Sequence, residues 1–92
     1  MKPFRWDHVK NEQLKSERHI SFEEIVLALE ADGLLDVTQH PNRRRYAHQQ
    51  MFIVAVNQYA YLVPFVEAAD YLFLKTAIPS RKATRDYLGS SD

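Results

Sequence analysis

Residues 51–78 read MFIVAVNQYAYLVPFVEAADYLFLKTAI, and this stretch decides the fold. It contains three apolar runs, 51–56, 59–66 and 71–78, which are rich in β-branched and aromatic residues. The connections between the runs are two to four residues long, as in β-hairpins. The pattern therefore predicts three strands in an antiparallel meander. Pro64 cannot donate a hydrogen bond to a neighbouring strand, so we expect an edge position or a bulge there.

The residues before this stretch predict two helices and two more strands. The segment 20–33, ISFEEIVLALEADG, places Ser21 and Glu24 at the spacing of an N-terminal capping box and ends in Gly33. An earlier helix follows Asp7, which is a suitable N-cap residue. Strands are expected over residues 3–6 and 34–38.

After the meander, Pro79 ends the last strand, Ser80 can cap a helix, and residues 81–88 form that helix. The predicted fold class is α+β: two N-terminal helices packed on an antiparallel sheet of four to five strands, with a short C-terminal helix. With helices on one face, the opposite face of the sheet is expected to be open. We expect the 92 residues to form a single domain, residues 1–92, around one modest core.

The composition excludes several classes of protein and site. No apolar run approaches the roughly 20 residues of a transmembrane helix, and no signal-peptide pattern opens the chain, so no membrane contact is predicted. The chain has no cysteine, which excludes disulfides and thiolate metal sites and fits a cytoplasmic location. The four histidines lack metal-ligand spacing, and there is no glycine-rich phosphate loop, so neither a metal nor a cofactor is expected.

The net charge is zero, but the charges are unevenly distributed. Residues 1–42 contain five basic and eight acidic residues, a net charge of −3. Residues 43–92 contain seven basic and four acidic residues, a net charge of +3. Such a split can attract phosphate to one face while the other meets a basic partner.

Two basic stretches are candidates for binding RNA. The first, NRRRY, provides Arg43, Arg44, Arg45 and Tyr46, which suit phosphate contact and base stacking; the alternatives are a solvated loop or the docking of an acidic partner. The second, FLKTAIPSRKATRDYL, covers residues 73–88. Lys82 is expected to pair with Asp86, whereas folding gives no clear reason for the cations Lys75, Arg81 and Arg85.

A ribonuclease that cleaves through the ribose 2′-hydroxyl needs cations to stabilise the phosphorane and groups that transfer protons. The residues after position 42 supply both kinds of side chain. The candidate catalytic residues are Arg81, Lys75, His19, His48 and Tyr87, with Arg85 as a further RNA contact. Which histidine acts, and whether Tyr87 instead packs under its helix, stays open at this point.

The chain also resembles a known family. FRWDHVKNEQLKSERHISFEE, residues 4–24, resembles the start of BrnT-type toxins of bacterial type II toxin–antitoxin pairs, and IPSRKAT, residues 78–84, resembles that family's closing segment. The matching residues are Trp6, Asp7, Lys10, Ser21, Phe22, Glu23, Glu24, Ser80, Arg81, Ala83 and Thr84. Leu14 stands where the family has asparagine, and Arg18-His19 stand where it has His-Gly. Arg18 or His19 would therefore have to replace that histidine.

The resemblance implies a RelE-like fold and an endoribonuclease that cleaves mRNA and blocks translation. It also implies a ribbon-helix-helix antitoxin that forms a hetero-oligomer with the chain and contributes any DNA binding. Two other interpretations stay open. One is a non-catalytic module of the same fold that binds the antitoxin and acts in transcriptional autoregulation. The other is a scaffold domain that self-associates through its divided charge.

Overall fold

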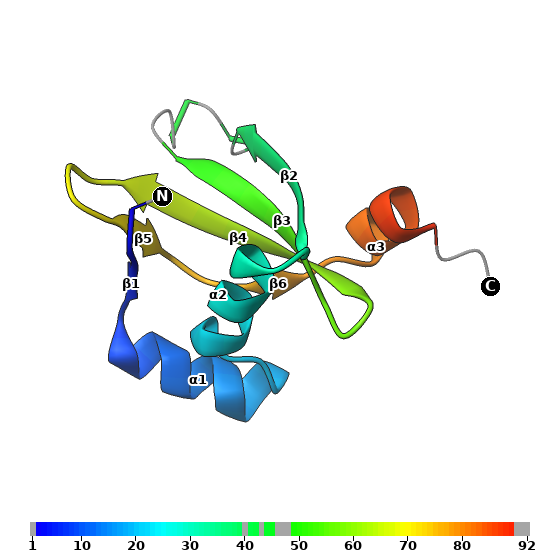
Figure 1. The fold of residues 1–92 in the computed structure, drawn as a ribbon, viewed down its shortest axis with the longest axis horizontal. Helices are drawn as coiled ribbons and strands as arrows, with labels where there is room; N and C mark the ends of the chain where they lie inside the picture. The colour runs from blue at the N-terminus through cyan, green and yellow to red at the C-terminus, as the bar shows by residue number, and fades with distance from the viewer. Residues whose placement is uncertain (1, 40, 43, 46–48, 90–92) are drawn as a thin grey trace.

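The structure is a computed structural model that describes residues 2–39, 41–42, 44–45 and 49–89. These residues form an α+β fold with three helices and six strands (Figure 1). The elements are β1 Phe4–Trp6, α1 His8–Arg18, α2 Phe22–Glu30, β2 Leu34–Gln39, β3 Gln50–Val56, β4 Tyr59–Glu67, β5 Leu72–Leu74, β6 Ile78–Pro79 and α3 Arg81–Leu88. Among the described helices, none has the length and apolar character needed to cross a membrane.

The sheet is mixed. Its strand order is β1-β5-β4-β3-β2, and β6 pairs with β4 on the same side as β5. β1 runs parallel to β5, with Phe4 beside Leu72, while the other pairs are antiparallel. The prediction of an antiparallel sheet of four to five strands is therefore wrong in strand count and in the direction of β1. Apolar alternation shows which face a strand buries, but it does not show the direction of a strand that has no hairpin partner.

The connection between β3 and β4 is a two-residue turn. Asn57 has φ 53° and Gln58 has φ 66°, and Val56 pairs with Tyr59 across them. Two positive φ values in a two-residue loop are typical of a type I′ turn, whose twist matches that of paired strands. The tight turn that the sequence predicts at Asn57-Gln58 is confirmed.

The partner of β4 changes at Pro64. Phe65 pairs with β5 and Leu62 pairs with β6, so two residues of β4 face three residues, 75–77, between those strands. Pro64 has no N–H to donate, and its carbonyl accepts from the Lys75 N–H at 2.8 Å. The predicted bulge is confirmed. It divides the last predicted strand of the meander into β5 and β6.

The helix starts follow the capping signals. The Asp7 side chain accepts from the Lys10 N–H at the start of α1, at 3.1 Å. Ser21 and Glu24 form both halves of the capping box at the start of α2. Ser80 caps α3 by accepting from the Ala83 N–H. All three predicted N-caps are confirmed.

The main core lies between the helices α1 and α2 and one face of the sheet. Its buried members are Leu14, Ile20, Phe22, Ile25, Leu29, Phe52, Val54, Val63, Phe65, Leu72, Leu74 and Ala77. The ring of Phe22 is fully buried and stacks on Trp6 of β1, with centroids 5.6 Å apart. This contact fixes β1 against the helices.

A buried asparagine joins the two helices. Asn11 is 1% exposed; its Oδ1 accepts from the Phe22 N–H at 2.8 Å, and its Nδ2 donates to Glu23 Oε1 at 2.8 Å. The Phe22 N–H lies in the first turn of α2 and has no partner within that helix. Asn11 therefore caps α2 from α1 and sets the angle of the corner between them.

α3 covers one end of the opposite sheet face. Ala83 packs with Ile53 and Ala60 in a second, smaller core. Thr84 is also buried, and its Oγ1 accepts from the Ala60 N–H at 2.8 Å and donates to the Ser80 carbonyl at 2.8 Å. The expectation of an open face therefore applies only to the part of the sheet beyond α3.

Candidate functional site

Arg81 is the first residue of α3 and is exposed to solvent. The first turn of α3 contains no acidic residue, although the N-terminal end of a helix carries partial positive charge. Within the described part of the chain, the Arg81 side chain makes no hydrogen bond or ion pair. A cation at a helix N-terminus is electrostatically unfavourable by itself and becomes favourable when an anion binds beside it.

The neighbouring cations of α3 have a carboxylate partner. Lys82 Nζ lies 2.9 Å from Asp86 Oδ2, as the sequence predicts, and Arg85 Nε lies 3.6 Å from Asp86 Oδ1. The hydrogen bond from Lys82, with a smaller contribution from Arg85, lowers the pKa of Asp86 below its usual value. The expectation that Arg85 has no partner is wrong, which leaves Arg81 as the cation of α3 that folding does not explain.

Lys75 follows β5 and points to the sheet face opposite α1 and α2. Its Nζ lies 5.5 Å from the centroid of the Phe73 ring, within range of a cation–π interaction. Lys75 and Phe73 therefore lie on the same face of the sheet. A regular strand would place Ala77 on that face too, but Ala77 is buried in the main core. The bulge at residues 75–77 explains the difference, because one extra residue reverses the side chains that follow it.

A second cation on this face was not predicted from the sequence. Arg5 of β1 pairs in register with Phe73 of β5, and its guanidinium lies 5.2 Å from the centroid of the Tyr71 ring. Arg5, Tyr71, Phe73 and Lys75 thus form a surface on which cations and aromatic rings lie together; we call it the basic–aromatic face. The only sequence signal for Arg5 is its place between two apolar residues, Phe4 and Trp6, because the β1–β5 pairing is not visible in the sequence.

Lys75 and Arg81 lie at different levels of the sheet. The Lys75 N–H binds the carbonyl of Pro64, whereas the N–H of Ser80, beside Arg81, binds the carbonyl of Ala60. These two carbonyls are four residues apart on β4, which corresponds to about 13 Å along a strand. The two cations are therefore placed one after the other along the sheet.

Arg18 connects α1 to the bulge. Its Nη1 donates to the Ala77 carbonyl at 2.7 Å. The end of α1, with His19, is thereby held to the segment between Lys75 and Arg81. Arg18 stands at the position where the resemblance to BrnT-type toxins expects histidine. One of its guanidinium N–H groups is therefore already engaged in the hydrogen bond to the Ala77 backbone carbonyl.

His19 is the C-cap residue of α1, exposed, with φ 56° in the left-handed region. A residue with a Cβ is strained there, so His19→Gly is expected to raise the free energy of unfolding by about 1 kcal/mol. Denaturant unfolding of H19G beside His19→Ala measures this, because both variants lose the imidazole and only glycine relieves the strain. An H19G protein no more stable than H19A would contradict the expectation.

Tyr87 ties α3 to β2. Its hydroxyl donates to Asp36 Oδ2 at 2.7 Å, and this hydrogen bond raises the pKa of Tyr87 and lowers the pKa of Asp36. The contact gives Tyr87 a structural role that its prediction as a proton-transfer group did not include. A raised pKa also makes the phenolate form harder to reach, which disfavours Tyr87 as a base.

Arg44 and Arg45, the arginines of the NRRRY stretch that the structure describes, lie at the other end of β3 from α3. Arg44 and Arg45 are exposed, and the Arg45 N–H donates to Asn42 Oδ1 at 3.2 Å. β3 begins at Gln50, on the side of the arginines in the sequence, whereas α3 contacts the Ala60 end of the β3–β4 hairpin (Figure 1). The structure therefore does not bring the described arginines of the first basic stretch, Arg44 and Arg45, together with α3. Three other predicted site residues lie outside the described residues: Arg43, Tyr46 and His48.

Within the ranges that the structure describes, no group of three histidine or acidic residues is arranged to hold a metal ion. Comparison of the chain with protein-family models finds no match, and comparisons with curated proteins and with solved structures also find none.

Proposed function

We propose that this chain is a BrnT-like toxin with a RelE-like fold, acting in the cytoplasm as a metal-independent endoribonuclease that cleaves mRNA and inhibits translation. The observation that carries the proposal is Arg81, an exposed cation at the start of α3 without a partner among the described residues. It lies within the segment that resembles the end of BrnT-type toxins. The basic–aromatic face supports the same proposal, because cations beside aromatic rings suit the phosphates and bases of single-stranded RNA.

In the proposed reaction, a base takes the proton of the RNA 2′-hydroxyl while its oxygen bonds to the adjacent phosphorus, and the bond from that phosphorus to the 5′-oxygen of the next nucleotide breaks. The products are a 2′,3′-cyclic phosphate and a 5′-hydroxyl, which takes its proton from water. Arg81 would stabilise the extra negative charge of the phosphorane, aided by the N-terminal end of α3. Lys75 binds β4 at Pro64, four residues or about 13 Å along the strand from the Ala60 carbonyl that binds Ser80, and would contact a phosphate further along the RNA while Phe73 stacks on a base. Arg85 would add to the positive electrostatic potential that attracts RNA. Arg44 and Arg45 would guide RNA or contact the antitoxin.

The reaction also needs groups that transfer protons. His19 belongs to the end of α1 that Arg18 holds against the bulge. We propose His19 as the candidate base within the described residues, with His48 as the alternative outside them. H19G offers a second readout here, since it should lose cleavage while gaining stability if His19 transfers the proton.

Arg81→Ala is expected to lower the rate of RNA cleavage about 10- to 100-fold, because it removes one charge contact to the transition state. Lys82→Ala is the matched control: it removes the neighbouring cation, whose charge is already paired with Asp86. The rate is measured with purified protein and a labelled RNA, and melting curves check that both variants fold. Growth arrest on expression in bacteria is the cellular readout.

The proposal fails if the folded wild-type chain cleaves no RNA with or without ribosomes and does not arrest growth. Equal rates for wild type and R81A would remove Arg81 from the mechanism while leaving ribonuclease activity in place. An equal fall in the rate of RNA cleavage in R81A and K82A would show that the rate depends on the net charge of the protein rather than on the position of Arg81.

A second candidate function is the non-catalytic module that binds a ribbon-helix-helix antitoxin, with DNA bound only through that antitoxin. The observation behind it is the hydrogen bond of the Tyr87 hydroxyl to Asp36, which argues against Tyr87 as a catalytic base and so against catalysis that depends on it. Formation of a hetero-oligomer with an antitoxin, without any RNA cleavage by the free chain, would support this function over the first.

A further inference from the structure

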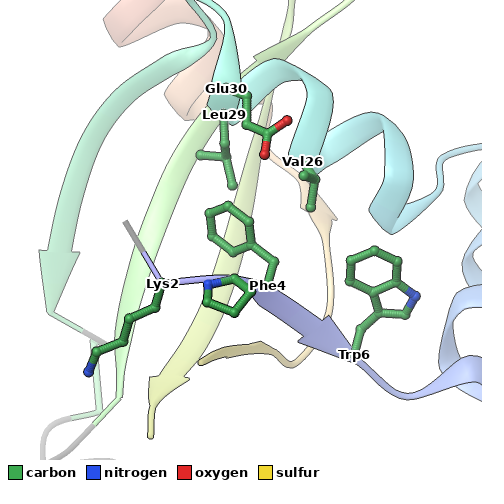
Figure 2. Close-up of a pocket in the computed structure, with 7 residues that line it drawn as sticks. Lys2, Phe4, Trp6, Val26, Leu29 and Glu30 are labelled. Atoms are coloured by element: carbon green, nitrogen blue, oxygen red, sulfur yellow. The ribbon is translucent and has the colours of Figure 1, made fainter. Parts of the chain in front are cut away.

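A groove lies between β1 and α2, on the helix-covered side of the sheet (Figure 2). It has a volume of about 540 Å³ and is lined by Lys2, Pro3, Phe4, Trp6, Val26, Leu29 and Glu30. Its aromatic walls are fixed by the core. Trp6 stacks on the buried Phe22, and the Phe4 ring meets Phe52 edge to face at 6.2 Å. The groove is therefore preformed, with an apolar floor that can accept an apolar side chain.

The two charged residues of the groove differ in their partners. Lys2 Nζ lies 2.6 Å from Glu67 Oε2 and donates to the Ala68 carbonyl at 2.8 Å, so its charge is already balanced. Glu30 is exposed and has no ion pair or hydrogen bond from its side chain within the described residues. In Figure 2 its carboxylate lies beside Leu29, at the end of the groove that α2 forms.

The end of α2 adds to this negative charge. The C-terminal end of a helix carries partial negative charge, which basic residues in the last turn usually offset. The last turn of α2 has no basic residue, and it ends in Glu30, followed closely by the exposed Asp32. Among the described residues, the end of α2 thus has no basic residue in its last turn, whereas the start of α3 has no acidic residue in its first turn.

We propose that the groove binds a segment of a partner protein that places an apolar side chain between Phe4 and Leu29 and a lysine or arginine beside Glu30. The negative charge of Glu30, Asp32 and the helix end excludes RNA and anionic lipid as occupants. The charge complementarity instead fits a basic amphipathic segment. The inference does not depend on RNA cleavage, because none of the residues that line the groove belongs to the candidate catalytic set.

The groove contains its own probe. Trp6 is the only tryptophan of the chain, so its fluorescence reports directly on occupation of the groove. The experiment titrates the full chain with a short amphipathic peptide of leucine, alanine and lysine, and with a twin in which glutamate replaces every lysine. We expect the lysine peptide to shift the emission of Trp6 in a saturable, salt-sensitive way, and the glutamate twin to have no effect.

Glu30→Lys is expected to weaken binding of the lysine peptide about tenfold, since it replaces an attraction with a repulsion near a partly buried surface. Glu17→Lys is the matched control, because Glu17 is an exposed carboxylate on α1 that does not line the groove. Glu30→Gln tests the charge with little change in shape and should give an intermediate loss. Circular dichroism confirms that each variant is folded.

Three results would overturn the inference. The first is that the lysine peptide does not shift the emission of Trp6 at concentrations up to about 1 mM. Such a result would mean that the peptide binds with a free energy weaker than about 4 kcal/mol. The second is equal binding of the two twins, or equal loss in E30K and E17K, which would indicate non-specific adsorption. The third is a shift that depends on protein concentration without peptide, which would identify a second copy of the chain as the occupant.

Discussion

Replacing Phe22 with alanine is expected to lower the free energy of unfolding by about 3–5 kcal/mol. The ring is fully buried between α2 and the sheet and stacks on Trp6, so its removal leaves a cavity that rigid neighbours cannot fill. The loss is measured by denaturant unfolding, with Trp6 fluorescence as the probe. Because the same ring supports Trp6, F22A should also weaken peptide binding in the groove.

Leu27→Ala is the control for Phe22. Leu27 lies on the same helix but is 68% exposed, so its truncation removes little packing and should change stability by about 0.5 kcal/mol or less. A loss in F22A no larger than that in L27A would show that α2 does not pack on the sheet as described.

Replacing Asn11 with alanine is expected to lower the free energy of unfolding by about 3 kcal/mol. The Phe22 N–H would lose its acceptor while remaining buried, and the side chain of Glu23 would lose its donor. The Asn11 hydrogen bond is the main cause of the lowered pKa of Glu23. This contribution is present above the unfolded pKa of Glu23 and is lost as pH falls through its lowered folded pKa. The difference in free energy of unfolding between wild type and N11A should therefore become smaller in acid.

Asn11→Asp separates the two hydrogen bonds. Its carboxylate can still accept from the Phe22 N–H, but it places a second negative charge against Glu23. We expect N11D to be destabilised at neutral pH and to recover relative to wild type in acid, when a neutral carboxyl can donate. Wild-type stability in N11A at neutral pH would contradict the role of this residue as the cap of α2.

Local signals in the sequence predicted most elements of the fold. The capping residues Asp7, Ser21 and Ser80 mark the starts of the three helices, because each satisfies N–H groups that lie only a few residues away. The hairpin at Asn57-Gln58 follows from two apolar runs with a two-residue gap. In both cases the interacting groups are near neighbours along the chain, so the pattern contains the information.

Non-local features were not predictable in this way. The parallel pairing of β1 with β5 joins residues from opposite ends of the chain, and no local pattern encodes it. The break at residues 75–77 depends on the level at which Pro64 meets the neighbouring strand. Pro64 indicates that the hydrogen-bond ladder must be interrupted, but the neighbouring strand determines where the extra residue of the bulge is placed.

In the candidate site too, contacts between near neighbours in the sequence are predictable and contacts between distant residues are not. The ion pair between Lys82 and Asp86, which are one helical turn apart, is predictable from their spacing. The contact of Arg18 with the Ala77 carbonyl and the position of Arg5 beside Tyr71 require the tertiary fold, and spacing alone could not reveal them. Asp86 also faces Arg85, because one carboxylate has two oxygens and can face two cations; helical spacing points only to Lys82.

The pairing of Phe4 with Leu72 has a consequence for synthesis on the ribosome. Translation runs from the N-terminus, so β1 emerges long before β5, the strand that it needs. Until residues 72–74 have left the exit tunnel, Phe4 and Trp6 have no neighbouring strand, and the edge of the sheet is incomplete. The nascent chain would complete this edge of the sheet only after residues 72–74 are exposed, and the slow closure of such distant contacts would delay its maturation further.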